Sequence, residues 1–367
     1  MTDCDRNVRE LLHRAIRAGT APAAVAAWRR AGEKISDTAL GTAIVFPEHV
    51  NAAPDSWFDL ASLTKPLVTT TLTLLAFRSG AIAATTRVGE VLDEVRGTEV
   101  GGLEVRQLLT HTGGLPGWLP LYCVAEGRPD LLPSRLGEVR LEARPGDRVV
   151  YSCVGFVILG LMLRRIADQD LESLFRLQVL RVLGLEEELG LKVNLATHSL
   201  AGGAAQPTAE MRMVRDLGLD QRWLPATAHG LPDDGNARFL EGNAGNAGLF
   251  GSARGVVALA SEYLPGGGSL LSAGEAYEAT TLHTAGLQQG RGFGWQLATT
   301  AGCSAGPVVS KASFGHTGFT GVSVWCDPQT KDVTALLTNR NHPAQRGNDL
   351  NPLRKRYHAV VRQAIER

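Results

Sequence analysis

Alternating apolar segments typical of β-strands lie near both ends of this chain, and the region between them is rich in helical patterns and loops. Residues 23–30 and 34–44 flank a glycine-containing turn and predict a hairpin. Residues 321–326 and 333–338 flank a polar turn and predict a second one. We therefore expect one antiparallel sheet built from both ends of the chain, in an α+β fold of the α/β/α sandwich type with an all-helical domain inserted.

The length of 367 residues exceeds one typical hydrophobic core, so two domains are expected. We assign residues 1–80 and 243–367 to an α/β sheet domain and residues 81–242 to a helical domain, with the active site in the cleft between them. Helical spacing of apolar residues predicts a helix at residues 252–263 and others near both termini. Residues 292–298 alternate and predict a further strand.

Composition excludes several classes of function. The formal net charge is zero, and no basic segment suggests binding to nucleic acid or to a membrane surface. The longest apolar run, residues 153–163, is too short to cross a bilayer. The first residues show no apolar signal segment, so we expect a cytoplasmic protein, although a processed start would leave a periplasmic or secreted location open. Five cysteines without C-x-x-C spacing predict free thiols.

The spacing of Ser62 and Lys65 is typical of a serine nucleophile with a lysine partner. The run from Asp59 to Phe77 predicts a buried helix, on which residues three apart share a face. A lysine that has lost its proton can take one from a hydroxyl, and a helix N-terminus favours negative charge near the serine oxygen. This is the only Ser-x-x-Lys sequence in the chain, although the pair alone is equally typical of a helix start with a solvated lysine.

Three further motifs accompany this pair, and each by itself is typical of ordinary structure. Tyr151 follows a turn and precedes a predicted helix, where a phenol can transfer a proton or form a half-buried packing contact. The segment from His316 to Gly321 places glycines before a strand, where a backbone N–H can point at an oxyanion. Residues 243–251 predict a loop of small residues that either holds an anion or lets two domains pack closely.

Other catalytic chemistries have little support in the sequence. There is no H-E-x-x-H, no Cys/His cluster at metal spacing and no phosphate-binding G-x-x-x-x-G-K-[ST], so we predict no metal site and no cofactor. The glycines of residues 290–295 open no helix and indicate a strand start rather than a nucleotide loop. His111 could act as a base, but its turn-forming neighbours favour a structural role.

In this order the motifs resemble those of the penicillin-recognising serine hydrolases. That superfamily includes class C β-lactamases, D-alanyl-D-alanine carboxypeptidases, D-stereospecific aminopeptidases and lactamase-like esterases. The resemblance covers about residues 20–362, and it implies a β-lactamase/transpeptidase-like fold and a serine hydrolase that works through an acyl-enzyme. The segments that carry it are residues 58–65 (FDLASLTK), 108–116 (LLTHTGGLP), 145–160, 234–236 with 245–253, and 314–321 with 337–340.

The resemblance also implies roles for single residues. Ser62 would be the acylated nucleophile, and Lys65 would be its proton partner. Tyr151 would serve as general base or acid and protonate the leaving group. The backbone N–H groups of Ser62 and Phe319 would form the oxyanion hole.

Two positions depart from the pattern of many relatives. His316, Thr317 and Gly318 stand where those relatives have Lys-Thr-Gly on the strand that lines the cleft, and Cys153 stands where they have an asparagine. A thiol cannot offer the paired donor and acceptor of an amide, so one substrate contact or one restraint on the lysine is lost. The reference pKa of histidine is about 6.5, so we expect a substrate carboxylate to be held weakly at neutral pH and more strongly below that value.

Both departures favour a serine hydrolase of ester or amide bonds, including those of D-amino-acid peptides. The first alternative is a true β-lactamase or a D-alanyl-D-alanine carboxypeptidase. The second is a slow acyl-binding receptor or a non-catalytic binding module, because deacylation depends on a water position that sequence does not show. We expect a small-molecule or short-peptide substrate and neither nucleic acid nor membrane as a partner, and we predict no oligomeric state.

Overall fold

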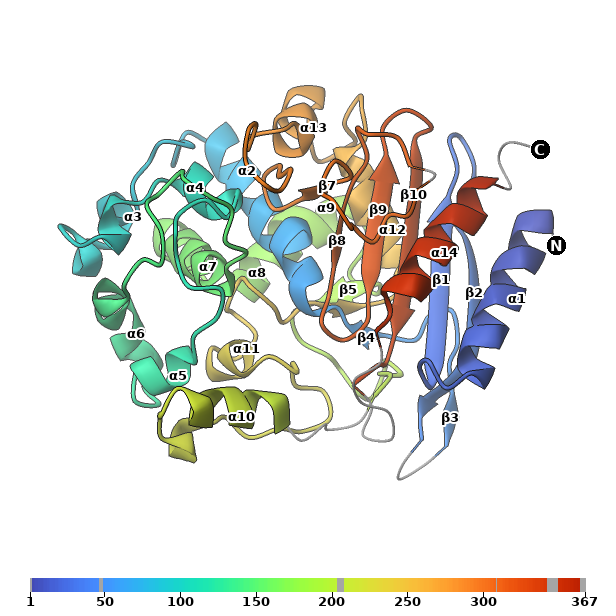
Figure 1. Cartoon of the computed structure of the whole chain (residues 1–367), viewed down its shortest axis with the longest axis horizontal. Helices are drawn as coiled ribbons and strands as arrows, with labels where there is room; N and C mark the ends of the chain where they lie inside the picture. The colour runs from blue at the N-terminus through green and yellow to red at the C-terminus, as the bar shows by residue number, and fades with distance from the viewer. Residues whose placement is uncertain (1, 46–48, 203–207, 308, 342–348, 364–367) are drawn as a thin grey trace.

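The main sheet is built from both ends of the chain. A computed structural model describes residues 2–45, 49–202, 208–307, 309–341 and 349–363 (Figure 1). Seven of the described strands form an antiparallel sheet in the order β3-β2-β1-β10-β9-β8-β7. They are β1 (Ala23–Arg29), β2 (Ser36–Ile44), β3 (Val50–Asn51), β7 (Gln296–Leu297), β8 (Phe314–Thr317), β9 (Ser323–Asp327) and β10 (Asp332–Thr338). Because β1 pairs with β10, the sheet joins the two predicted hairpins, and that prediction is confirmed.

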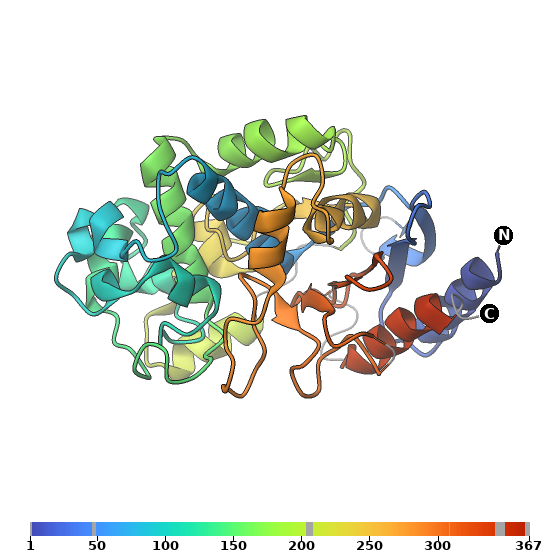
Figure 2. The same cartoon turned by 90° about the horizontal axis from the view of Figure 1, so that it is seen from above.

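Helices cover both faces of this sheet. The covering helices are α1 (Asp3–Arg17), α14 (Asn351–Gln363) and α12 (Ala253–Ala260). Side chains of β1 alternate between the faces: Ala24 and Ala26 join the cluster formed with α1 and α14, while Val25 and Ala27 face the core that includes α12. Figure 2 shows α1 and α14 side by side on one side of the sheet and α12 on the other. The predicted α/β/α sandwich is therefore confirmed.

A helical region lies beside the sheet (Figure 1). Its α-helices are α2 (Thr71–Arg78), α3 (Val88–Val91), α4 (Val105–Leu109), α5 (Leu121–Val124), α6 (Leu132–Arg135), α7 (Cys153–Ala167), α8 (Leu171–Phe175), α9 (Arg181–Leu183), α10 (Thr208–Asp216) and α11 (Gly235–Phe239), and α13 (Ala273–Thr280) follows α12. α7 forms the centre, because every residue from Val154 to Leu163 is buried. The domain boundaries at residues 80/81 and 242/243 stay a prediction.

A small second sheet connects this region to the main sheet. Its strands are β4 (Phe58–Asp59), β6 (Phe250–Gly251) and β5 (Leu189–Gly190), in the order β4-β6-β5. β5 lies within a region that the sequence pattern predicted to be helical. Through β4, this sheet fixes the start of the segment that carries Ser62.

The structure confirms the helix predicted before residue 264 and only half of the strand predicted after residue 291. The helix predicted at residues 252–263 is confirmed as α12 followed by a 3₁₀ turn at Ser261–Tyr263. The strand predicted at residues 292–298 is wrong for its first half, because only Gln296–Leu297 forms β7. The preceding residues form a turn, in which Gly294 adopts a φ of 71° and so cannot continue a strand.

No helix among the described residues is both long enough and apolar enough to cross a membrane. All five cysteines are free thiols, as the sequence predicted.

Candidate active site

A tight strand-to-helix turn places Ser62 at the N-terminal start of a buried helical run. β4 ends at Asp59, a 3₁₀ turn spans Ala61–Leu63, and a π-helical segment spans Lys65–Thr70 before α2. The predicted helix therefore begins at Ala61 rather than at Asp59. Ala61 has a φ of 45°, a left-handed conformation that costs about 1–2 kcal/mol for a residue with a side chain. Asp59 stabilises it, because Oδ1 accepts the N–H of Ala61 at 2.8 Å.

Lys65 is fully buried, and its ammonium group has several hydrogen-bond partners. Nζ donates to Ser62 Oγ at 3.0 Å, to the Asn246 carbonyl at 2.9 Å and to Cys153 Sγ at 3.4 Å. The side chain of Tyr151 also hydrogen-bonds to this group, so these partners share the three hydrogens of the ammonium, which has no acceptor. The structure thus brings Ser62, Lys65 and Cys153 together around one buried cation.

Opposing effects act on the pKa of Lys65. Burial acts to lower this pKa, but interactions with Cys153 and Tyr151 raise it and outweigh the burial. The net result is a pKa above the ordinary value for lysine. Lys65 therefore stays charged at neutral pH and stabilises negative charge on the groups around it.

Tyr151 lies directly before α7, in a segment held by His111. The N–H of Ser152 donates to His111 Nδ1 at 3.0 Å, and Ser152 Oγ caps α7 by accepting the N–H of Gly155 at 3.2 Å. The ring of His111 lies 4.6 Å from that of Tyr151, and Lys65 Nζ lies 5.1 Å from the centre of the Tyr151 ring. Burial, together with nearby positive charges, lowers the pKa of His111 well below its ordinary value. This position agrees with a structural role for His111.

His316 on β8 is buried and neutral. Its Nδ1 lies 2.8 Å from the Thr317 carbonyl oxygen, and because a carbonyl only accepts, Nδ1 carries the proton and Nε2 is left as an acceptor. Burial lowers the pKa of His316 well below its ordinary value, and the charges of Lys65 and Arg291 lower it further. The expectation that His316 becomes a cation as the pH falls through about 6.5 is therefore corrected. Its ring centre lies 5.8 Å from that of Tyr151.

The outer edge of β8 is open beside this cluster. β7 pairs only with Phe314 and Gly315, so the backbone of His316 and Thr317 has no strand neighbour on that side among the described residues. An extended substrate can add to such an edge through backbone hydrogen bonds.

The turn after β8 presents the backbone of Phe319. Gly318 N donates to the Val322 carbonyl at 2.8 Å, and the buried side chain of Arg354 donates to the carbonyls of Gly318 and Val322 at 2.9 Å each. The N–H groups of Ser62 and Phe319 donate to no residue that the structure describes. Both are therefore available to an oxyanion.

Sequence reasoning assigned no individual role to three residues of this site. Asn246 gives its carbonyl to Lys65, Arg291 is buried with Cζ 5.5 Å from the centre of the Tyr151 ring, and Asp59 holds the turn before the serine. Each contact joins segments far apart in the chain, or depends on a backbone angle, and leaves no local pattern. The glycines of the loop around Asn246 were the one available signal.

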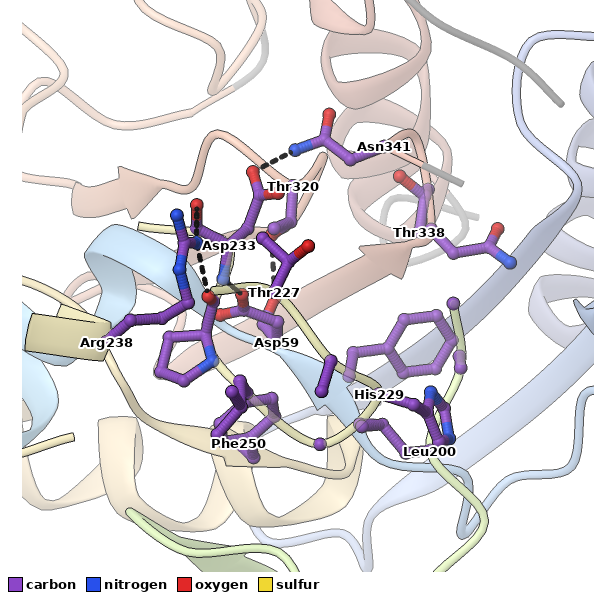
Figure 3. A pocket seen from close by; sticks show the side chains of 18 residues that line it. Asp59, Leu200, Thr227, His229, Asp233, Arg238, Phe250, Thr320, Thr338 and Asn341 are labelled. Carbon is purple, nitrogen blue, oxygen red and sulfur yellow. Dashed lines mark hydrogen bonds between the residues drawn. The ribbon is translucent and has the colours of Figure 1, made fainter. Parts of the chain in front are cut away.

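A pocket lined in part by Asp59 adjoins the turn before the serine (Figure 3). Asp59 Oδ2 accepts the N–H of Asp233 at 2.7 Å, and Asp233 Oδ2 in turn accepts from Asn341 at 2.7 Å. Burial raises the pKa of Asp59 to about 7, because it outweighs the hydrogen bond from Asp233. Asp59 thus links the turn that carries Ser62 to the loop before α11.

These groups supply the parts that acyl transfer requires: a hydroxyl held by a buried cation, a phenol beside that cation, and two free backbone donors. Within the described ranges, no group of three or more His, Cys, Asp or Glu side chains is placed to hold a metal ion.

The family model named Beta-lactamase matches residues 5–359. The chain belongs to this family. A protein of Escherichia coli (strain K12), provisionally named a D-alanyl-D-alanine carboxypeptidase, is 25% identical over 342 residues, which cover 84% of this chain and 75% of the relative. A protein of Salmonella enteritidis PT4 (strain P125109) with the same provisional name is 23% identical over 331 residues, covering 83% and 74%.

Solved structures have the same fold. A penicillin-binding protein homologue from Caulobacter crescentus aligns with a TM-score of 0.76 at 20% identity, covering 99% of this chain and 98% of that one. A class C β-lactamase aligns with a TM-score of 0.75 at 17% identity, covering 99% of this chain and 97% of that one. EstCE1, described as a hydrolase with promiscuous acyltransferase activity, aligns with a TM-score of 0.72 at 21% identity, covering 99% of this chain and 98% of that one. The β-lactamase/transpeptidase-like fold is confirmed. The protein is a serine hydrolase of this family.

Proposed function

We propose that Ser62 attacks the carbonyl carbon of an ester or amide bond and carries the acyl group. The observation that supports this most directly is the hydrogen bond from Lys65 Nζ to Ser62 Oγ. Because the ammonium donates in this bond, the hydroxyl proton of Ser62 points toward another group. The substrate is a small molecule or a short peptide.

We assign proton transfer to Tyr151 rather than to Lys65. The ammonium has no lone pair, so we assign to the side-chain oxygen of Tyr151 the acceptance of the Ser62 proton, as the bond from Oγ to the carbonyl carbon forms. Tyr151 returns this proton to the leaving atom as the bond to the leaving group breaks. Water then attacks the acyl-enzyme, gives one proton to Tyr151, and Ser62 Oγ recovers that proton as the acid product leaves.

The negative oxygen of each tetrahedral intermediate is assigned to the backbone N–H groups of Ser62 and Phe319. Donors fixed before the reaction stabilise such charge without reorganisation, and losing one typically costs about 10²–10³-fold in rate. Arg354 positions the second donor, because it fixes the carbonyls on both sides of Phe319.

The preferred substrate on this proposal carries no carboxylate beside the scissile bond. His316 is neutral and offers an acceptor at Nε2, which suits an amide N–H or an amine better than an anion. Cys153 lacks the amide pair that its asparagine counterpart would supply. Neutral esters and amides, including those of D-amino-acid peptides, are therefore favoured over β-lactams.

A D-alanyl-D-alanine carboxypeptidase is the second candidate, because two relatives bear that provisional name. A β-lactamase and a slow acyl-binding receptor would use the same nucleophile, and they differ from an esterase in substrate preference and in the lifetime of the acyl-enzyme. The cleft between the predicted domains is proposed as the substrate site. The free thiols support a reducing compartment such as the cytoplasm.

The substrate proposal is tested by comparing kcat/KM for p-nitrophenyl butyrate and nitrocefin in the wild type and in His316→Lys. The wild type should hydrolyse the ester, with weak or absent turnover of nitrocefin. Because His316 is neutral, lowering the pH through 6.5 should not raise the nitrocefin-to-ester ratio. A fixed cation at this position should raise that ratio by about tenfold or more, since discrimination between substrates is measured by this ratio.

Ester hydrolysis by His316→Lys is the internal control, because it reports whether the buried substitution leaves the site intact. Nitrocefin turnover that rivals ester turnover in the wild type would contradict the proposal and favour a β-lactamase. An acyl adduct that persists for hours would instead favour the receptor.

A further inference from the structure

Arg291 is a buried cation that faces Tyr151. It lies in the loop between α13 and β7, and 5% of its surface is exposed. Its backbone is fixed on both sides: the N–H donates to Thr284 Oγ1 at 2.9 Å, and the carbonyl accepts from His283 N at 2.9 Å. The guanidinium carbon lies 5.5 Å from the centre of the Tyr151 ring.

The charge of Arg291 has little compensation from its surroundings. Nη2 donates to Gln289 Oε1 at 2.7 Å, a neutral acceptor, and Nε has no partner among the described residues. Burial lowers the pKa of Arg291 to about 10, and Tyr151 is the group that opposes this decrease. A buried charge without an ion-pair partner destabilises a fold, and such charges are enriched at functional sites.

Positive charge reaches Tyr151 from two directions. Lys65 Nζ lies 5.1 Å from the ring centre, on the side of the π-helical segment, and Arg291 approaches from the loop before β7. The other titratable groups around the ring are His111, His316 and Cys153, and the two histidines are neutral. No carboxylate forms an ion pair with Arg291 among the described residues, so nothing there neutralises its field.

We propose that Arg291 is a positioning residue whose charge stabilises the phenolate of Tyr151 during proton transfer. The inference rests on the role assigned to Tyr151 under the proposed function. Arg291 forms and breaks no bond: the proton moves from Ser62 Oγ to Tyr151 and from Tyr151 to the leaving atom. A fixed cation 5.5 Å from the ring centre stabilises the negative charge that develops on the phenol oxygen while the proton moves. It supplies charge that the neutral ring of His316 does not.

The test is the pH dependence of kcat/KM for p-nitrophenyl butyrate in Arg291→Gln, Arg291→Lys and Gln289→Glu, corrected for uncatalysed hydrolysis. Arg291→Gln should lose about 10- to 100-fold at pH 7. The loss should shrink as the pH rises toward about 10, because burial lowers the pKa of Arg291 to about that value and the wild type then loses the charge that the variant lacks. Arg291→Lys should keep most of the activity. Gln289→Glu places a carboxylate on Nη2 and should cause a smaller loss with the same pH dependence.

Arg78→Gln is the matched control, because that guanidinium belongs to α2 and pairs with Glu275 instead of facing the site. It should leave the pH profile unchanged. A loss in Arg291→Gln that is equal at every pH, or a wild-type profile in that variant, would overturn the proposal. If Arg291→Gln does not fold, a wild-type profile in Gln289→Glu overturns it.

Tyr151→Phe separates this inference from the function on which it rests. If Tyr151→Phe is inactive while Arg291→Gln keeps the wild-type profile, the proton-transfer role of Tyr151 stands and only the role of Arg291 is wrong. If Tyr151→Phe keeps wild-type activity, the proposed mechanism itself is wrong.

Discussion

Single residues at this site combine strain with buried charge. Ala61 holds a left-handed φ of 45° directly before Ser62, and the hydrogen bond to Asp59 Oδ1 helps to maintain it. Such outliers persist only where the surrounding contacts over-determine them. Lys65, buried and fully hydrogen-bonded, fixes the other side of the serine. The serine hydroxyl is therefore positioned before any substrate arrives.

Asp59 should make the free energy of unfolding decrease as the pH rises, and substitution by asparagine should remove this dependence. The pKa of its carboxyl is raised to about 7 in the fold, from an ordinary value of about 3.8. Its stabilising contribution is then fully present below that ordinary value and is lost as the pH rises through about 7. Between pH 5 and 7 the free energy of unfolding of the wild type should fall, relative to that of Asp59→Asn, by of order 1 kcal/mol per pH unit.

Urea unfolding of both proteins across this range measures the difference. Asp59→Asn should also lose one of the two backbone hydrogen bonds, since an amide has one acceptor oxygen, at a cost of about 1 kcal/mol. A difference between the two proteins that is constant with pH would contradict the account of Asp59.

At the scale of elements, close backbone packing brings the Asn246 carbonyl to Lys65. A Cβ at Gly160, in α7, would lie 2.7 Å from the Ala244 carbonyl oxygen, and one at Gly245 would lie 2.5 Å from the Phe156 carbonyl oxygen. Gly245 also has a φ of 87°. The predicted loop of small residues at 243–251 thus packs directly against α7. This contact agrees with the interpretation that its small residues allow close packing.

Gly160→Ala should therefore affect both stability and catalysis. The added methyl group must displace the loop, which typically costs about 1–3 kcal/mol in a packed core. It should also lower kcat/KM, because the loop carries the Asn246 carbonyl that holds Lys65. Thermal unfolding and ester kinetics measure the two effects.

Gly274→Ala is the matched control, because this glycine lies in helix α13 with open space at its Cβ position. It should raise stability by up to about 1 kcal/mol, as alanine is the better helix former, and leave kcat/KM unchanged. If Gly160→Ala behaves like this control, the packing account is wrong.

Elements with strong local patterns were predictable from sequence. The two hairpins, α12 and the helices at both termini follow from periodicity and turn residues, because burial of one face imposes that pattern. The strand predicted at residues 292–298 failed because a turn interrupts its first half. The short strands β4, β5 and β6 have two residues each and are too brief to leave a pattern.

At the scale of the whole molecule, the sheet joins the two ends of the chain, and the site lies where distant segments meet. The spacing of Ser62 and Lys65 was predictable because it is local. The contacts of Asn246 and Arg291 were not, because each depends on how separate segments pack. The contact of Asp59 with Ala61 is local, but it depends on a backbone angle that the sequence pattern does not show. The charge state of His316 was also missed, since the pKa of a histidine depends on burial that its neighbours in sequence do not reveal.

The most direct test of the account is to locate the covalent adduct of a fluorophosphonate by peptide mass. The account predicts one label, on Ser62, and no label in Ser62→Ala, which should still fold because the hydroxyl is half-buried and contributes little to packing. Ester hydrolysis should fall by several orders of magnitude in that variant. A label on another residue, or undiminished hydrolysis by Ser62→Ala, would contradict the central claim.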